Sequence, residues 1–188
     1  MNQRLELTHA DYSCHRPRPH AEDVQSIGAG HRYVSADSFR AAMGRVATPV
    51  SVVTTFRAGK AYGSTVSAFL SLSLDPPMAL VSLDAASSLL SSLEVGSPVG
   101  LNVLASNQGE CAMRFAVKGP DKFKGVEWKL TAGAPRLPGL HVWMAGRVSE
   151  IGPAGDHVLV HVGVEVAEPG QGSPLTYWQG AFGTHAAF

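Results

Sequence analysis

Residues 50–69 read VSVVTTFRAGKAYGSTVSAF, and this stretch decides the fold class. Residues 50–56 are β-branched, hydroxyl-bearing and aromatic, a composition that favours a pleated sheet. Arg57-Ala58-Gly59-Lys60 is typical of a hairpin turn. A second strand is predicted over residues 61–69. The stretch therefore predicts two antiparallel strands joined by a tight turn.

Further strand-like runs follow, separated by glycine and proline. They cover residues 78–83, 99–104, 140–151, 157–166 and 175–178. Helices are predicted over 86–95 and 108–117, and another begins near Ser35 or Asp37, either of which would cap it, and ends at Thr48-Pro49. Many strands, glycine-rich turns and few helices predict a mainly β protein, an antiparallel barrel with short flanking helices.

The composition limits the function classes. The chain has 188 residues, 15 basic and 15 acidic side chains, and no polybasic run, which argues against nucleic acid or a membrane surface as partner. No apolar run approaches the ~20 residues of a membrane helix. Two cysteines give no disulfide framework, so a cytoplasmic location is expected. Residues 1–34 are predicted to be a flexible extension, and residues 35–188 one domain.

The familiar motifs of side-chain catalysis and metal binding are missing from the sequence. It contains no HExxH, no Cys/His cluster with metal spacing, no Walker loop, no GxGxxG after a strand and no GxSxG. No catalytic side chain and no metal ligand are therefore predicted. If the protein is an enzyme, its chemistry is expected to come from a cofactor.

Hydroxyl side chains gather in residues 63–77, GSTVSAFLSLSLDPP. Alternate side chains of a strand share a face, so Thr65 and Ser67, with Ser71 and Ser73, would line one surface suited to the polar edge of a ligand. Gly63 would let that ligand approach the backbone closely. The alternative is that these are ordinary exposed strand residues.

Other polar residues also have two interpretations. Ser87 and Ser88 either only cap the predicted helix or also bind an anion at its N-terminus. Asn102 lies within an apolar strand and makes either a structural hydrogen bond or a ligand contact. His157, in Gly155-Asp156-His157, is either an exposed turn residue or part of a pocket mouth. Phe115 has core-like spacing, whereas Tyr177 fits a core or a pocket wall.

Several ordered motifs together resemble the flavin reductase domain family, which has the FMN-binding split-barrel fold. The resemblance covers about residues 36–182. Its motifs are Phe39-Arg40-x-x-Met43-Gly44-Arg45-Val46-Ala47-Thr48, residues 50–55, 63–69 and 71–77, Asn102-Val103-Leu104, Ala112-Met113-Arg114-Phe115-Ala116, Asp121-Lys122-Phe123, Gly155-Asp156-His157 and Pro174-Leu175-x-Tyr177-x-x-Gly180.

The resemblance implies a homodimer that binds FMN or FAD near the subunit interface and reduces it with NADH or NADPH. Reduced flavin would diffuse to a separate oxygenase, in natural-product or aromatic-compound metabolism. The implied flavin-binding residues are Thr48, Pro49, Val50, Ser64, Thr65, Val66, Ser67, Ser71, Ser73, Ser87, Ser88, Asn102 and Phe115. Of these, Ser87 and Ser88 would lie near the phosphate, and Asn102 and Phe115 beside the ring and ribityl chain. His157 and Tyr177 would bind the nicotinamide.

The sequence departs from the family pattern in the loop at Pro49, where proline removes an N–H, and at Leu70 and Leu89. Leu89 stands where a threonine would help to bind phosphate. Two other functions stay open: an oxidoreductase that retains its flavin and acts on an organic substrate, and a flavin-binding module without reductase activity.

Overall fold

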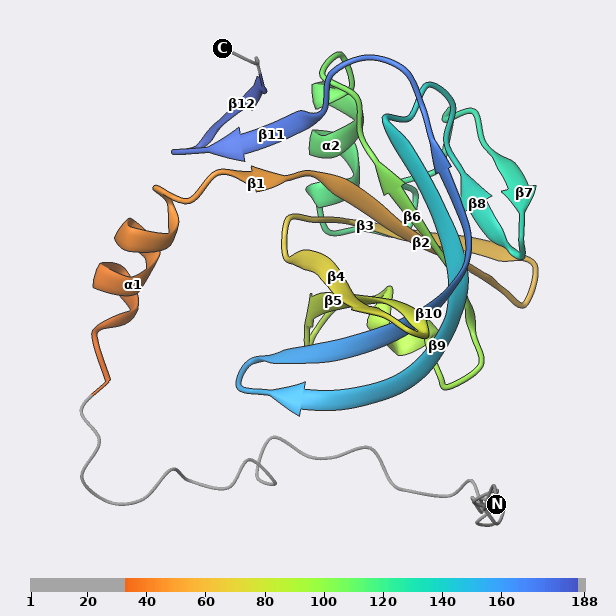
Figure 1. Cartoon of the computed structure of the whole chain (residues 1–188), viewed down its shortest axis with the longest axis horizontal. Helices are drawn as coiled ribbons and strands as arrows, with labels where there is room; N and C mark the ends of the chain where they lie inside the picture. The colour runs from red at the N-terminus through yellow and green to blue at the C-terminus, as the bar shows by residue number, and fades with distance from the viewer. Residues whose placement is uncertain (1–32, 186–188) are drawn as a thin grey trace, which may run out of the picture.

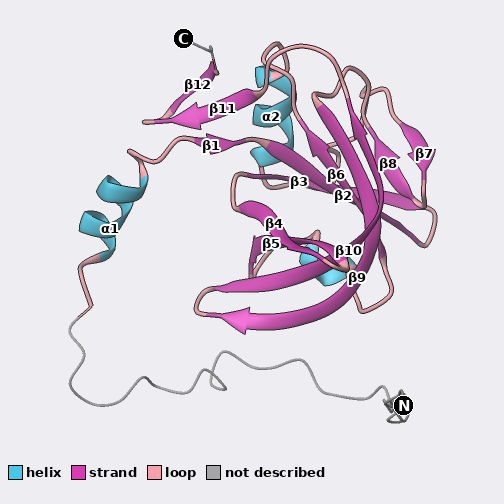
Figure 2. Cartoon of the chain, viewed as in Figure 1, coloured by secondary structure: helices cyan, strands magenta, loops and turns pink. Residues whose placement is uncertain are grey.

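The computed structural model describes residues 33–185 as a curled antiparallel sheet with two short helices at its margins (Figure 1). The predicted mainly β fold is confirmed (Figure 2). Seven strands pair in the order β3-β2-β6-β9-β10-β5-β4. They are β2 (Ser51–Arg57), β3 (Lys60–Val66), β4 (Phe69–Leu74), β5 (Pro77–Asp84), β6 (Pro98–Val103), β9 (Val142–Ala154) and β10 (His157–Pro169).

Smaller elements complete the fold. A three-stranded sheet has the order β1-β11-β12, and β7 and β8 form a hairpin of their own. The bounds are β1 (Thr48–Pro49), β7 (Lys129–Thr131), β8 (Ala134–Arg136), β11 (Leu175–Trp178), β12 (Ala181–Thr184), α1 (Ala36–Met43), η2 (Leu90–Ser92) and α2 (Gly109–Ala116). No helix among residues 33–185 is long and apolar enough to cross a membrane.

The core consists of two clusters of buried aliphatic and aromatic side chains. One lies inside the curled sheet and includes Val53, Leu101 and Val160. The other packs α2 against the sheet through Ala112 and Phe115. The runs at 50–56, 78–83 and 99–104 were correctly predicted as strands: buried residues alternate along β5, whereas β2 and β6 are buried almost throughout.

The predicted single strand over residues 61–69 is wrong, because the chain leaves the sheet at Ser67 and Ala68. β3 pairs with β2, whereas β4 pairs with β5 at the opposite end of the sheet order. The N–H of Ser82 donates to the carbonyl of Ala68 at 2.9 Å. β3 and β4 are therefore the two edge strands of one sheet, and the two residues Ser67 and Ala68 connect them.

The predicted helix over residues 86–95 is also wrong. Only the short 3₁₀ turn η2 forms there. The hydroxyls of Ser91 and Ser92 both donate to the carbonyl of Ser88, at 2.8 and 3.0 Å, and such local bonds compete with helical ones. Leu89 and Leu93, which are spaced as on one face of a helix, are buried in the core although no α-helix forms.

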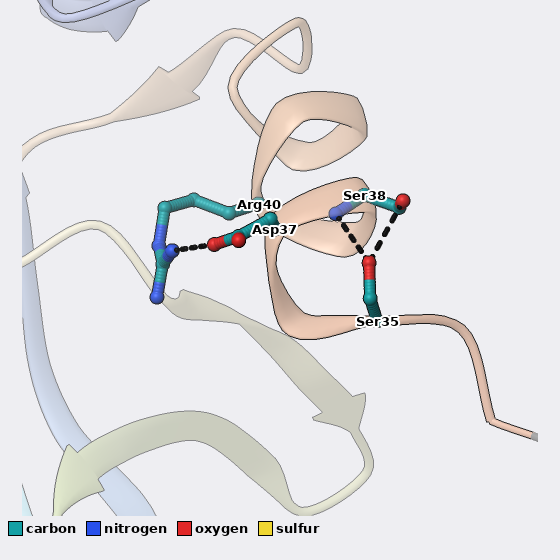
Figure 3. Close-up of polar contacts among 4 residues, drawn as sticks. All are labelled: Ser35, Asp37, Ser38 and Arg40. Atoms are coloured by element: carbon teal, nitrogen blue, oxygen red, sulfur yellow. Dashed lines mark hydrogen bonds and ion pairs between the residues drawn. The ribbon is translucent and has the colours of Figure 1, made fainter.

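The two other predicted helices are confirmed, although α1 buries nothing. The side chain of Ser35 accepts a hydrogen bond from the N–H of Ser38, so Ser35 is the N-cap, and Asp37 pairs with Arg40 instead (Figure 3). The apolar side chains of α1 are uncovered: Phe39 is 60% exposed. α1 stands apart from the barrel in Figure 1, linked to it by β1. The proposed extension over residues 1–34 lies almost wholly outside the described residues.

Candidate active site

A pocket of about 520 Å³ lies beside the open edge of β3. Three segments far apart in sequence surround it: β3 with the two residues that follow, the turn after β5, and the loop after α2. His157 at the start of β10 completes it, because His157 pairs with Asp84 at the end of β5. The lining comprises residues 60–68, 82–84, 86–88, 116, 118–120, 122, 123 and 157.

The β3 side of the pocket offers backbone groups and hydroxyls. β3 pairs only with β2, so the backbone N–H and C=O groups on its other edge have no strand partner. The hydroxyl of Thr65 donates to the carbonyl of Ala112 at 2.6 Å, which fixes β3 against α2. Ser64 and Ser67 form no side-chain hydrogen bond within residues 33–185, so their hydroxyls are available to a ligand.

Gly63 allows close packing at the β3 side of the pocket. A Cβ atom at this position would lie 2.9 Å from the Phe115 ring and 3.2 Å from the Phe123 ring. Those two rings meet edge to face, with centroids 4.9 Å apart. The glycine therefore lets α2 and the loop that follows it pack closely on β3, and its backbone also lines the pocket.

The turn after β5 presents two further hydroxyls. The carboxylate of Asp84 accepts a hydrogen bond from the N–H of Ala86 at 2.7 Å, and the Asp84 carbonyl accepts one from Ser87 at 2.8 Å. This arrangement fixes the turn without any helix, so the predicted helix N-terminus is absent from the site. The hydroxyls of Ser87 and Ser88 make no hydrogen bond among the described residues and both line the pocket.

His157 has a defined hydrogen-bond partner. Its Nδ1 lies 2.8 Å from the Asp156 carboxylate, and because a carboxylate only accepts, Nδ1 carries the proton. The hydrogen bond from His157 lowers the pKa of Asp156. In the neutral ring Nε2 is then left as an acceptor at the pocket wall.

Comparison with known proteins identifies the chain. Residues 43–186 match the family model described as the flavin reductase like domain. The chain belongs to this family. It is 35% identical over 158 residues to an NADH:riboflavin 5'-phosphate oxidoreductase of Streptomyces pristinaespiralis, covering 80% of this chain and 89% of that protein.

Other flavin reductases agree with this assignment. The reductase component of a 4-nitrophenol 4-monooxygenase/4-nitrocatechol 2-monooxygenase from Rhodococcus opacus is 34% identical over 145 residues, covering 77% of this chain and 78% of that protein. The NADH:FAD oxidoreductase SgcE6 of Streptomyces globisporus C-1027, solved with NAD and FAD fragments, superposes with a TM-score of 0.74 at 25% identity. That match covers 83% of this chain and 98% of the other. The predicted split-barrel fold is confirmed.

The residues predicted for this flavin reductase fall into separate places. Those that line the pocket are Ser64, Thr65, Val66, Ser67, Ser87, Ser88 and His157. Ser71 and Ser73 do not line it, because the chain turns at Ser67–Ala68 and a bulge follows between them. The expectation that they share one strand face with Thr65 is wrong.

Asn102 and Phe115 lie in the core instead. Asn102 is 0% exposed. Its amide nitrogen lies 2.9 Å from the carbonyl of Val52, to which it donates, and its oxygen accepts from the N–H of Leu137 at 2.9 Å. Phe115, also fully buried, packs beneath Gly63. Of the two interpretations of Asn102, the structure supports the structural hydrogen bond.

Thr48, Pro49 and Tyr177 meet at a third place, the pairing of β1 with β11, while Val50 is buried beside them. Thr48 lies opposite Tyr177 in this pairing. The Tyr177 and Phe182 rings lie 5.5 Å apart and are partly exposed. None of these residues lines the pocket of the same chain.

Three lysines that were not among the predicted site residues also lie at the pocket. Lys60, Lys118 and Lys122 all line it. Lys122 donates to the carbonyl of Phe115 at 2.8 Å, and burial lowers the pKa of its ammonium group. The signal for them was the concentration of three lysines in residues 118–124, directly after α2.

Proposed function

We propose that this protein is an NAD(P)H:flavin oxidoreductase that reduces FMN or FAD and releases it to a separate oxygenase. The observation that carries the proposal is the pocket itself. It is lined by the open edge of β3, by Ser87 and Ser88 in the turn after β5, and by His157, whose ring is hydrogen-bonded to Asp156. Each of these three suits a different part of the two cofactors.

The β3 edge and the serine turn suit a flavin. The pyrimidine side of the flavin ring carries an N–H between two carbonyl groups, which complements unpaired backbone groups along β3. The hydroxyls of Ser64 and Ser67 suit the ribityl chain. Ser87 and Ser88 offer free hydroxyl donors to a phosphate, and a hydrogen bond to a charged group contributes about 1.5–3 kcal/mol.

His157 suits the nicotinamide. With its Nδ1 proton held by Asp156, Nε2 accepts a hydrogen bond from a carboxamide N–H. When both cofactors are bound, the reduced nicotinamide supplies a hydride that the flavin accepts. The contribution of the chain is to hold the two rings together and in register, so that proximity supplies most of the acceleration and no side-chain nucleophile is needed.

A homodimer forms part of the proposal. Large apolar side chains lie uncovered on α1, on β4 and on β11–β12; they include Phe39, Met43, Leu70, Leu72, Leu74, Trp178 and Phe182. A second copy would cover them, as the family resemblance implies. Thr48, Pro49 and Tyr177, at the β1–β11 pairing, lie outside the pocket of their own chain. In a dimer these residues would instead lie beside the pocket of the second copy.

The test is a steady-state assay of NADH oxidation in air with FMN, FAD or riboflavin added. Turnover that rises with free flavin and saturates supports a reductase that treats flavin as a substrate. Stoichiometric flavin that survives gel filtration, with no stimulation by added flavin, supports an enzyme that retains its flavin. Tight flavin binding without NADH oxidation supports a binding module, and either result would contradict the proposal. NADPH in place of NADH establishes the preferred reductant.

A further inference from the structure

Positive charge is concentrated around the pocket, although the chain as a whole has a formal net charge of zero. Lys60, Lys118 and Lys122 line it, and Asp84 is the only carboxylate among the lining residues. The lining therefore holds three lysine side chains against one carboxylate. Such a concentration attracts anions to the pocket.

These lysines are not neutralised within residues 33–185. Arg57, Arg136 and Arg147 pair with glutamates, but no lysine of the pocket forms an ion pair. Lys60 instead lies over the Tyr62 ring, 5.4 Å from its centroid. Lys118 is exposed and makes no side-chain hydrogen bond in the described part of the chain. The charge of these side chains is therefore available to a ligand.

The loop that carries Lys118 and Lys122 is anchored against β3. Phe123 packs edge to face on Phe115, which contacts Gly63. Lys122 donates to the carbonyl of Phe115, the second-last residue of α2. Packing and this hydrogen bond hold Lys122 at the pocket wall, and Lys118 lines the same pocket from the same loop.

The serine turn supplies no charge to an anion. Ser87 and Ser88 are neutral, no helix begins there, and Leu89 points into the core. Asp84 at the same turn is negative. A dianionic phosphate in the pocket would receive neutral hydroxyl donors from this turn and positive charge only from the lysines.

We propose that Lys118 and Lys122 bind the phosphate group of the flavin and thereby make the pocket selective for phosphorylated flavins over riboflavin. This inference rests on the proposed flavin reductase function. The nicotinamide cofactor also carries phosphate, as its pyrophosphate, and the experiment below separates the two sources.

The test measures dissociation constants of the full-length protein for FMN and for riboflavin by flavin fluorescence, without reductant. The variants are Lys118→Gln, Lys122→Gln and the double variant, with Lys124→Gln as control, because Lys124 lies on the same loop but outside the pocket lining. We expect FMN binding to weaken about tenfold or more for each pocket lysine, since a charge-assisted hydrogen bond contributes about 1.5–3 kcal/mol. Riboflavin binding and the control variant should stay within about twofold of the parent.

Several results would overturn the inference. Equal weakening of FMN and riboflavin would show a general effect on the pocket, and unchanged FMN binding would show no role for the lysines. A raised KM for NADH with unchanged FMN binding would assign them to the pyrophosphate of the nicotinamide. Lys122 also contacts α2, so Lys122→Arg, which keeps the positive charge, should restore the FMN affinity that Lys122→Gln loses. If Lys122→Gln unfolds, Lys118→Gln alone tests the proposal. A parent protein that binds neither flavin would instead reject the proposed function itself.

Discussion

At the residue scale, Ser87 and Ser88 line the pocket with hydroxyl groups that make no hydrogen bond in the described part of the chain, as Ser64 and Ser67 also do. Replacing both with alanine should weaken FMN binding by about 1.5–3 kcal/mol for each hydroxyl that contacts the phosphate. The turn itself should persist, because Asp84 fixes it through backbone N–H groups. A fluorescence titration measures the effect, with Ser106→Ala as an exposed control. FMN binding as tight as that of the parent would leave these serines without a role in the site.

His157 should act on the nicotinamide rather than on the flavin. His157→Ala should raise the KM for NADH or lower the rate of hydride transfer, while flavin affinity barely changes. Asp156→Ala should have a smaller effect in the same direction, because Asp156 orients the ring through Nδ1. Both are measured by NADH kinetics at saturating flavin, with His161→Ala, outside the pocket, as control. An equal loss of flavin binding would mark His157 as a flavin-site residue instead.

Asn102 should affect stability and not ligand binding. Asn102→Ala leaves the N–H of Leu137 and the carbonyl of Val52 without their partner in a buried place, which costs roughly 1–3 kcal/mol of unfolding free energy for each unsatisfied group. Urea denaturation measures this change, and exposed Asn107→Ala is the matched control. A flavin affinity that falls while the folded protein keeps its stability would contradict the structural role.

At the scale of elements, the contact between β3 and α2 decides the shape of the pocket. Gly63→Ala would place a methyl group against Phe115 and Phe123, and overpacking of this kind costs about 1–3 kcal/mol. We expect a lower melting temperature together with weaker flavin binding, because the loop after α2 would move from the pocket. Gly152→Ala is the control, since a Cβ atom there meets nothing within 4 Å.

Strands were predictable where β-branched residues are concentrated, as in residues 50–56, and where buried residues alternate with more exposed ones, as in residues 78–83. The prediction failed at Ser67–Ala68, since the chain leaves one edge of the sheet for the other there and no local pattern marks that change of partner. It failed again at residues 86–95, where leucines at helical spacing are buried but serine hydroxyls bond to the backbone instead. Tertiary pairing and side-chain competition outweighed local propensity at both places.

About half of the candidate site could be predicted from the sequence. Residues 64–67 are the last three residues of β3 and the one that follows, so their shared position follows from proximity in the chain. Whether a polar residue such as Asn102 faces a ligand or the core depends on packing that the sequence pattern does not contain. Lys118 joins the pocket only because Phe123 packs on Phe115 and brings the loop back to β3.

At the scale of the whole molecule, α1 and the β1–β11–β12 sheet need a partner surface. An isolated helix of eight residues is marginal in water, and α1 buries no residue of its own. We therefore expect a dimer by sedimentation and a melting temperature that rises with protein concentration. Phe39→Ser/Met43→Ser should shift the equilibrium toward monomer without changing the strand content seen by circular dichroism. A parent protein that stays monomeric at all concentrations would contradict the dimer.

The exposed edge at β4 has a consequence for handling the protein. β4 presents Leu70, Leu72 and Leu74 to solvent, and Leu74 is 87% exposed. β4 pairs with β5 along one edge, and its other edge is free. A free edge on an apolar strand is a template to which a strand of another molecule can add, which is the first step of aggregation. The monomeric Phe39→Ser/Met43→Ser variant, kept concentrated, should therefore precipitate from the folded state, with the barrel intact, before it unfolds.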